Sequence, residues 1–194
     1  MSQQPSTAKE KIKSAFIKIY KEKAINEITI GNLAAEADVY RGTFYYHYPD
    51  IYALLEDVKE DAKANFTQHL IPLLPAFLVS DYSQHRFRPI EEFYEKNEEL
   101  IRLFLIEKPD IQLLSYAKTA LKKLLLETFQ LTDCEFPQKF HYMLEFTTSG
   151  QVALIRKWFQ DGRKLTTADL SSAIKICTGG FVSYLKELRA EPIN

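Results

Sequence analysis

The sequence has few cysteines, no long apolar run and no large excess of charge of either sign. Its two cysteines, Cys134 and Cys177, are far apart and have neither a CxxC nor a Cys/His spacing, so we expect buried, reduced thiols and no disulfide framework. No apolar segment approaches the roughly 20 residues of a membrane-spanning helix, and the N-terminus lacks the apolar block of a signal peptide. We therefore expect a cytoplasmic protein that does not contact a membrane.

The sequence also lacks the short motifs that carry common enzyme chemistry, since it contains no GxGxxG, P-loop, GxSxG or HExxH pattern. No pair of its four histidines has the spacing of a metal site on a helix. These absences argue against an enzyme. They also lead us to expect no metal and no other cofactor.

What is present is the composition of an ordinary globular protein. The chain has 194 residues, of which 46% are hydrophobic and 26% charged, and its net charge is −1. Such a chain can bury a core in one or two domains. Residues 1–50 carry seven lysines and arginines against six acidic residues, and six of these cations fall between Lys9 and Lys23. This stretch is either a basic face for a polyanion or a solvated helix face.

Apolar residues recur with the helical period along nearly the whole chain. The N-terminal part predicts helices over residues 7–23, 30–37 and 40–46 and a fourth helix that starts at Asp50. The three-residue connection between the second and third of these helices predicts a helix-turn-helix. Further helices are expected at about 90–106, 110–129, 136–159 and 169–189, the third of them ended by Asp161-Gly162. No alternating strand pattern or repeat is visible, so the expected fold class is all-α.

The segment TIGNLAAEADVYRGTFYYHYPDIYALL, residues 29–55, resembles the DNA-binding domain of TetR-type (TetR/AcrR family) transcriptional repressors. It matches the family's pattern at Thr29, Ile30, Leu33, Ala34, Ala37, Val39, Gly42, Thr43, Phe44, Tyr45, His47 and Tyr48. A weaker likeness joins FTTSGQVALIRKWFQDGRKLTTADLSSAI to the C-terminal domains of Firmicutes members. The resemblance implies a helix-turn-helix DNA-binding domain in residues 1–50, and a C-terminal bundle in residues 51–194 that binds a ligand and dimerises.

The resemblance also implies roles for the aromatic run VYRGTFYYHYPD, residues 39–50. Side chains expected to face base edges are Tyr40, Arg41 and Gly42, and those expected to hold phosphates are Thr29, Thr43, Tyr45, Tyr46 and His47. Phe44 and Tyr48 are expected to point inward. Alternatively, the whole aromatic cluster fills the core. The chain departs from the family pattern at Asp38, Tyr40 and Ile51, where a turn glycine, a capping serine and a lysine are usual.

The last two helices are the expected dimer interface, because two helices from each subunit make a four-helix bundle. The candidate interface residues are Trp158, Ala173, Cys177, Gly180, Phe181, Tyr184 and Leu185. By resemblance the protein is a transcriptional regulator, expected to be a repressor, that binds a palindromic operator in double-stranded DNA as a homodimer. A small-molecule or protein effector in the C-terminal domain would release or modulate it. The alternative is a helical adaptor or co-regulator whose C-terminal domain binds a protein partner.

Overall fold

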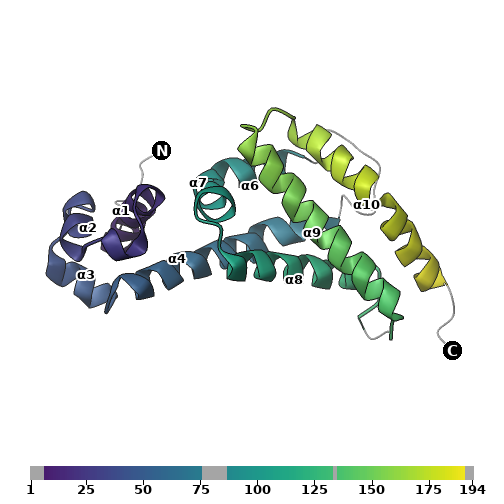
Figure 1. Ribbon diagram of the computed structural model, residues 1–194, viewed down its shortest axis with the longest axis horizontal. Coiled ribbons are helices and arrows are strands. Elements are labelled where there is room, and N and C mark those ends of the chain that lie inside the picture. The colour runs from purple at the N-terminus through teal and green to yellow at the C-terminus, as the bar shows by residue number, and fades with distance from the viewer. Residues whose placement is uncertain (1–6, 76–86, 133–134, 191–194) are drawn as a thin grey trace. The chain divides into compact units, whose positions relative to one another are not determined.

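The computed structural model describes residues 7–75, 87–132 and 135–190, with side chains as far as residue 188 (Figure 1). Within these ranges the chain forms helices and no strand, which confirms the all-α class. The chain divides into two compact units, Met1–Ala62 and Lys63–Asn194, called unit 1 and unit 2 below. The division falls inside one helix, so that the chain passes from unit 1 to unit 2 without a loop.

Unit 1 consists of short helices whose ends are set by local side chains. Its helices are α1 (Ala8–Glu22), the 3-10 turn Ile25–Glu27, α2 (Ile30–Glu36), α3 (Arg41–His47) and the first part of α4 (Ile51–Asn65). Thr7 caps α1 in a capping box: its hydroxyl accepts the Glu10 N–H at 3.2 Å, and the Glu10 carboxylate accepts the Thr7 N–H at 2.7 Å. Asp50 caps α4 by accepting the Ala53 N–H at 2.8 Å. These helices confirm the predicted N-terminal pattern.

The turn between α2 and α3 holds the two helices of the helix-turn-helix together. Asp38 adopts the left-handed conformation with φ 52°, as expected for the residue that replaces the usual glycine. Ala37 beside it is buried, and Val39 returns its N–H to the Ala34 carbonyl at 3.0 Å. The core below consists of fully buried side chains: Ile12, Phe16, Leu33, Phe44 and Leu54.

Unit 2 contains the three longest helices of the described residues together with several short ones. After α4 the chain makes a wider π-helical turn, Phe66–Leu70, and a 3-10 turn, Ile71–Leu73. The remaining helices are α6 (Arg88–Lys96), α7 (Glu98–Arg102), a second π-helical turn (Leu103–Glu107), α8 (Ile111–Thr128), α9 (Gln138–Gln160) and α10 (Thr167–Ala190). None of the helices in the described ranges is long and apolar enough to cross a membrane.

The single helix predicted over residues 90–106 is wrong, because the structure breaks it at Asn97. The Asn97 side-chain amide donates to the Phe93 carbonyl at 2.9 Å, and its backbone N–H donates to the same oxygen at 3.0 Å. Asn97 leaves helical geometry at φ −108°, ψ 10°. A side chain that bonds locally to the backbone offers this segment an alternative to continuous helix.

The predicted end of α9 is confirmed. Gly162, with φ 74°, donates its N–H to Phe159 at 3.1 Å, and Arg163 donates its N–H to Trp158 at 2.8 Å. This pair of bonds is the Schellman arrangement, which satisfies carbonyl groups at a helix C-terminus. The chain then turns back into α10, which packs against α9 (Figure 1).

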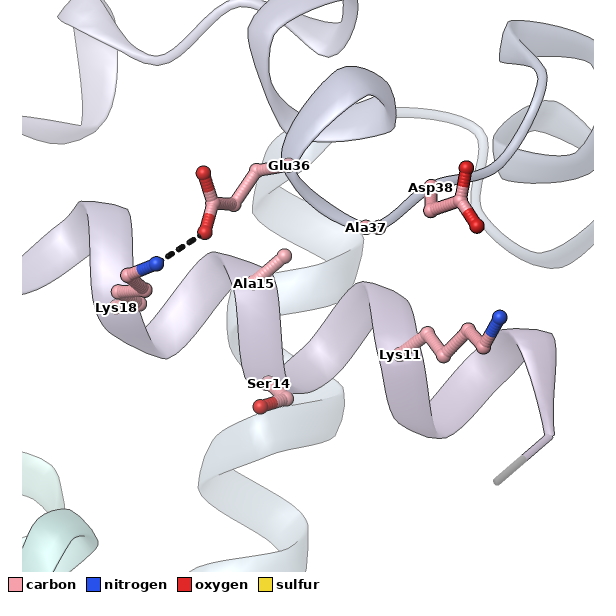
Figure 2. A pocket seen from close by; sticks show the side chains of 7 residues that line it. All are labelled: Lys11, Ser14, Ala15, Lys18, Glu36, Ala37 and Asp38. Atoms are coloured by element: carbon pink, nitrogen blue, oxygen red, sulfur yellow. Dashed lines mark hydrogen bonds and ion pairs between the residues drawn. The ribbon is translucent and has the colours of Figure 1, made fainter. Parts of the chain in front are cut away.

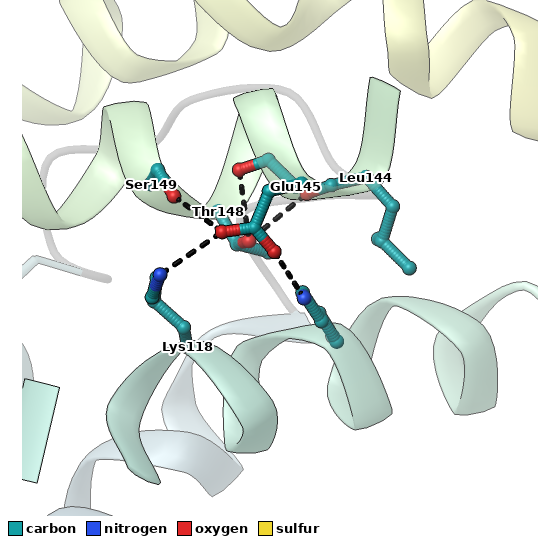
Figure 3. A network of polar contacts seen from close by, with 6 residues as sticks. Lys118, Leu144, Glu145, Thr148 and Ser149 are labelled. Carbon is teal, nitrogen blue, oxygen red and sulfur yellow. Dashed lines mark hydrogen bonds and ion pairs between the residues drawn. The ribbon is translucent and has the colours of Figure 1, made fainter. Parts of the chain in front are cut away.

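Two apolar clusters form the core of unit 2, and α9 contributes to both. One cluster contains Trp158 and Phe159, and the other contains Phe140 and Leu144. Helices α8 and α9 are also joined by Glu145 of α9, whose carboxylate binds Lys118 of α8 at 2.9 Å and Lys122 of α8 (Figure 3). The same carboxylate accepts the hydroxyl of Ser149, one turn along α9, at 3.0 Å. Hydrogen bonds from Lys122 and Lys118 lower the pKa of Glu145 to about 2.

The expectation of two buried thiols is wrong for Cys177, which is a free cysteine on the exposed side of α10. Its neighbour Ile176 is also exposed. Cys134 lies outside the described residues. The exposed thiol and its apolar neighbour show that the outer side of α10 is not covered within the described part of the chain.

Candidate nucleic-acid interface

Helix α3 has two opposite faces. Phe44 and Tyr48 are buried, as predicted, with their ring centroids 5.8 Å apart. Tyr40, Tyr46 and Tyr45 instead expose 87%, 85% and 58% of their surface. The alternative that the whole aromatic run fills the core is therefore wrong, since only one face of it does. The exposed rings present hydroxyl groups to the solvent around α3.

The first turn of α3 is open enough for close approach. A side chain built on Gly42 would meet no atom within 4 Å. Tyr40, immediately before the helix, makes no side-chain cap hydrogen bond, as expected from the loss of the usual serine. Gly42 therefore leaves bare backbone at the point where a major-groove helix comes nearest to base edges.

Arg41 is exposed but does not extend away from the protein. Its guanidinium lies over Gly31 in the first turn of α2, where an added Cβ would come within 2.4 Å of Nη2. The absence of a side chain at Gly31 is what makes room for this arrangement. Thr29, just before α2, accepts the Asn32 N–H on its hydroxyl at 3.2 Å.

Thr43 and His47 lie half-buried along the sides of α3. The His47 ring packs edge-on against Tyr46 with centroids 5.0 Å apart. The structure therefore brings together the predicted residues of α3, and Thr29 lies at the start of the adjacent α2. Tyr52, in the first turn of α4 directly after the motif, is also 56% exposed and was not among the predicted residues. The signal that could have found it is a tyrosine on the polar side of an amphipathic helix directly after the motif.

The lysines of α1 are largely engaged within unit 1. Lys9 and Lys13 bind Asp57 at 2.9 and 2.7 Å, and Lys18 binds Glu36. Ion pairs of this kind leave less cationic charge available to a polyanion. The lysine-rich stretch therefore fits neither interpretation fully, because Lys9, Lys13 and Lys18 are paired with carboxylates of the same unit.

A shallow groove of about 350 Å³ lies between α1 and the turn of the helix-turn-helix (Figure 2). Its lining holds two cations, Lys11 and Lys18, and two carboxylates, Glu36 and Asp38. In Figure 2 the Lys18–Glu36 pair spans one end of it. The opposite charges balance, so the groove offers no net attraction to an anion. In the part of the chain that the structure describes, no cluster of histidine, cysteine and acidic side chains could hold a metal ion.

The residues predicted for the dimer interface occupy two different environments. Trp158, Phe181 and Leu185 lie in the apolar clusters of unit 2, and the Trp158 Nε1–H donates to the Leu165 carbonyl at 2.8 Å. These three side chains are therefore not on a free surface. Of the others, Ala173 and Tyr184 are half-buried, and Cys177 and Gly180 are exposed.

Comparison with known proteins decides the family. Residues 81–179, about half of the chain, match the family model TetR_C_8, described as a transcriptional regulator C-terminal region. The chain belongs to the TetR-type transcriptional regulators.

Individual relatives agree with this assignment. The chain is 37% identical over 59 residues to the HTH-type transcriptional regulator YxbF of Bacillus subtilis (strain 168); these residues make up 30% of this chain and only 16% of YxbF. A TetR transcriptional regulator from Streptococcus agalactiae 2603V has a similar fold, with TM-score 0.58 and 21% identity over 92% of this chain and 93% of that one. The dihydroxyacetone kinase operon activator DhaS is similar with TM-score 0.54 and 16% identity, over 91% of this chain and 97% of DhaS.

Proposed function

We propose that this TetR-type regulator binds a palindromic operator in double-stranded DNA as a homodimer, with α3 in the major groove. The observation that carries the proposal is the exposed tyrosine face of α3, formed by Tyr45 and Tyr46 on the helix and by Tyr40 immediately before it. Large rings exposed to water in a unit with a closed core indicate a binding surface. Their hydroxyls can donate to phosphate oxygens, which fix a protein on the duplex.

The proposed contacts divide between phosphates and bases. Thr29, Thr43, Tyr45, Tyr46 and His47 hold the backbone, and Tyr52 extends this set onto α4. Tyr40, Arg41 and Gly42 face the base edges. Arg41 leaves its position over Gly31 to pair with the O6 and N7 atoms of guanine, a contact worth about 1–3 kcal/mol of discrimination.

The proposed dimer forms through α9 and α10, but not through the residues that are buried within the subunit. Each helix carries large apolar side chains on its exposed side: Tyr142 and Phe146 on α9, and Ile176 on α10. Gly180 adds an open position where a neighbouring helix can approach closely. Two subunits joined in this way place two recognition helices on successive turns of the major groove, roughly 34 Å apart.

Operator binding becomes regulated if an effector, either a small molecule or a protein, binds unit 2 more tightly in one arrangement of the dimer than in another. The two arrangements differ in how far apart the unit 1 of each subunit lies. We propose repression as the outcome of operator binding. Because the structural neighbour DhaS is an operon activator, a transcription assay on the selected operator must be able to detect activation as well as repression.

The test is selection of binding sites from random duplex DNA with the purified protein at two salt concentrations. The expected result for wild type is an enriched palindrome. With Arg41→Ala, the base preference should be lost at one position of each half-site. Since several lysines are engaged internally, the salt dependence should be shallow, with a logarithmic slope of about −2 to −4 for the dimer. Enrichment of no motif at either salt concentration would contradict operator binding.

A further inference from the structure

Three elements of unit 1 meet at one carboxylate. Asp57, in the second turn of α4, accepts the Tyr48 hydroxyl at 2.7 Å, the Lys13 ammonium at 2.7 Å and the Lys9 ammonium at 2.9 Å. The two lysines belong to α1, and Tyr48 is the residue that ends α3. Lys13 also binds Asp61, one turn further along α4, at 2.5 Å. Helix α1 and the end of α3 are thus both fastened to α4.

The chemistry of this junction makes the Tyr48 hydroxyl a donor and Asp57 its charged acceptor. Burial works to raise the pKa of Asp57, but hydrogen bonds from Lys13, Lys9 and Tyr48 outweigh it and lower the pKa to about 2. Burial and the neighbouring Asp57 raise the pKa of Tyr48. At neutral pH the junction is therefore a phenol bound to a carboxylate, which is a charge-assisted hydrogen bond.

Core packing alone does not require this hydroxyl. The Tyr48 ring is buried and lies beside Phe44, a place that a phenylalanine ring would fill equally well. The Lys9 ammonium also lies over the Tyr48 ring, 5.7 Å from its centroid. The hydroxyl adds one specific link, which spans the short connection between α3 and α4 and ends inside α4.

We propose that the Tyr48–Asp57 hydrogen bond is a positioning contact that holds the recognition helix at a fixed angle to α4. The proposal rests on the proposed operator binding. Since α4 runs on from unit 1 into unit 2, a fixed angle makes α3 follow any movement of α4. In a dimer this angle sets the spacing of the two recognition helices, so Tyr48 and Asp57 determine which half-site spacing is accepted without touching DNA.

The first arm of the test needs no DNA. Hydrogen exchange of residues 41–53 is compared in wild type, Tyr48→Phe and Asp57→Asn. The control is Glu36→Gln, which removes an ion pair to Lys18 in the same unit without touching the junction of α3 and α4. We expect exchange in this segment to rise about 10-fold in Tyr48→Phe, because one charge-assisted hydrogen bond is lost, and to stay unchanged in the control. Unchanged exchange in Tyr48→Phe overturns the proposal.

The second arm uses the operator obtained by selection from random duplex DNA. Affinities are measured for a single half-site, and for palindromes whose central spacer is shortened or lengthened by one or two base pairs. Tyr48→Phe should bind the half-site within about 2-fold of wild type, whereas its preference for the optimal spacer over its neighbours falls about 5-fold.

The outcomes separate this proposal from the proposed function. A wild-type spacer profile in Tyr48→Phe, or an equal loss for half-site and palindrome, overturns the positioning role while operator binding stands. A wild-type protein that binds no DNA overturns the proposed function, and the contact is then only a structural bond in unit 1.

Discussion

The helix-turn-helix of unit 1 exposes aromatic side chains, whereas the core of unit 2 buries them. In unit 1, Tyr40 and Tyr46 of the helix-turn-helix are almost fully exposed, whereas in unit 2 the rings of Phe140, Trp158 and Phe159 are buried in apolar clusters. The exposed rings of unit 1 carry hydroxyl groups and lie on a short helix or directly before it. An aromatic residue therefore carries information about DNA binding only together with the motif around it.

The two units also differ in how they use acidic residues. Asp57 of unit 1 and Glu145 of unit 2 each bind two lysines and one hydroxyl, and each has a pKa of about 2. Asp57 is partly buried and joins three elements, whereas Glu145 joins α8 to α9 (Figure 3). Similar chemistry thus joins three helices in one unit and fastens two helices in the other.

The largest expected effect compares a buried and an exposed phenylalanine. Phe44→Ala should lower the free energy of unfolding by about 3–5 kcal/mol, because Phe44 is fully buried. Phe146→Ala, at a residue that is 77% exposed, should change the stability of the subunit by less than about 0.5 kcal/mol. Urea unfolding followed by circular dichroism measures both, at a concentration where any dimer has dissociated. Equal losses of unfolding free energy in the two variants would contradict the assignment of Phe44 as buried and Phe146 as exposed.

The next effect concerns the exposed side of α10. Ile176→Asp should make the protein monomeric in sedimentation and weaken operator binding about 100-fold, because the avidity of two linked half-site contacts is lost. Its thermal unfolding as a monomer should not change. If Ile176→Asp stays dimeric, the dimer interface does not include this side of α10.

Gly42→Ala tests whether backbone approaches DNA at α3. The substitution has room in the free protein, and alanine should stabilise the helix by up to about 1 kcal/mol. Operator affinity should nevertheless fall about 10-fold, equivalent to about 1.4 kcal/mol, as measured by fluorescence anisotropy. Gly150→Ala is the matched control, at an equally open helical position of unit 2. Unchanged affinity in Gly42→Ala would place the DNA away from this turn.

Acid unfolding compares the two carboxylates. The folded-state pKa of Asp57 is lowered from 3.8 to about 2, so its contribution is present above about pH 4 and is lost as the pH falls toward 2. Asp57→Asn should remove about 1 kcal/mol of this acid-sensitive stability, measured as the difference in unfolding free energy between pH 5 and pH 2. Glu145→Gln should have a smaller effect because that residue is solvated. If the unfolding free energy of Asp57→Asn fell more steeply with decreasing pH than that of wild type, the ionised Asp57 carboxylate would not stabilise the folded protein.

The smallest effect is expected at the turn of the helix-turn-helix. Asp38→Gly should raise stability by about 0.5–1 kcal/mol, because glycine adopts the left-handed conformation without strain. A rise in the melting temperature checks this prediction. A fall would mean that the Asp38 carboxylate contributes more than the backbone strain costs.

The sequence predicted local features well, because neighbouring residues determine them. The helix starts at Thr29 and Asp50, the left-handed Asp38 and the Gly162 helix end all follow from residue type and position. The break at Asn97 was missed, since only the hydrogen bond of its side chain to Phe93 distinguishes it from an ordinary helical residue.

Contacts between distant residues could not be predicted in the same way. Asp57 binds lysines more than 40 positions away, and no local pattern encodes such a pairing. On helix α10 the apolar period placed Cys177 on the same stripe as Phe181 and Leu185, so it could not separate these two buried side chains from the exposed thiol. The exposed tyrosines of α3 were predicted only because a family pattern assigned a role to each position.

The most direct test of the account removes hydroxyl groups from the exposed face of α3 without removing its rings. Operator affinity of the triple variant Tyr40→Phe, Tyr45→Phe, Tyr46→Phe is compared with wild type and with Tyr142→Phe, an exposed tyrosine of unit 2. We predict that each half-site is bound about 100-fold more weakly by the triple variant, at roughly 1 kcal/mol for each of the three hydrogen bonds lost per subunit, with unchanged melting and no effect in the control. Wild-type affinity in the triple variant would contradict the claim that this face binds DNA through its hydroxyl groups.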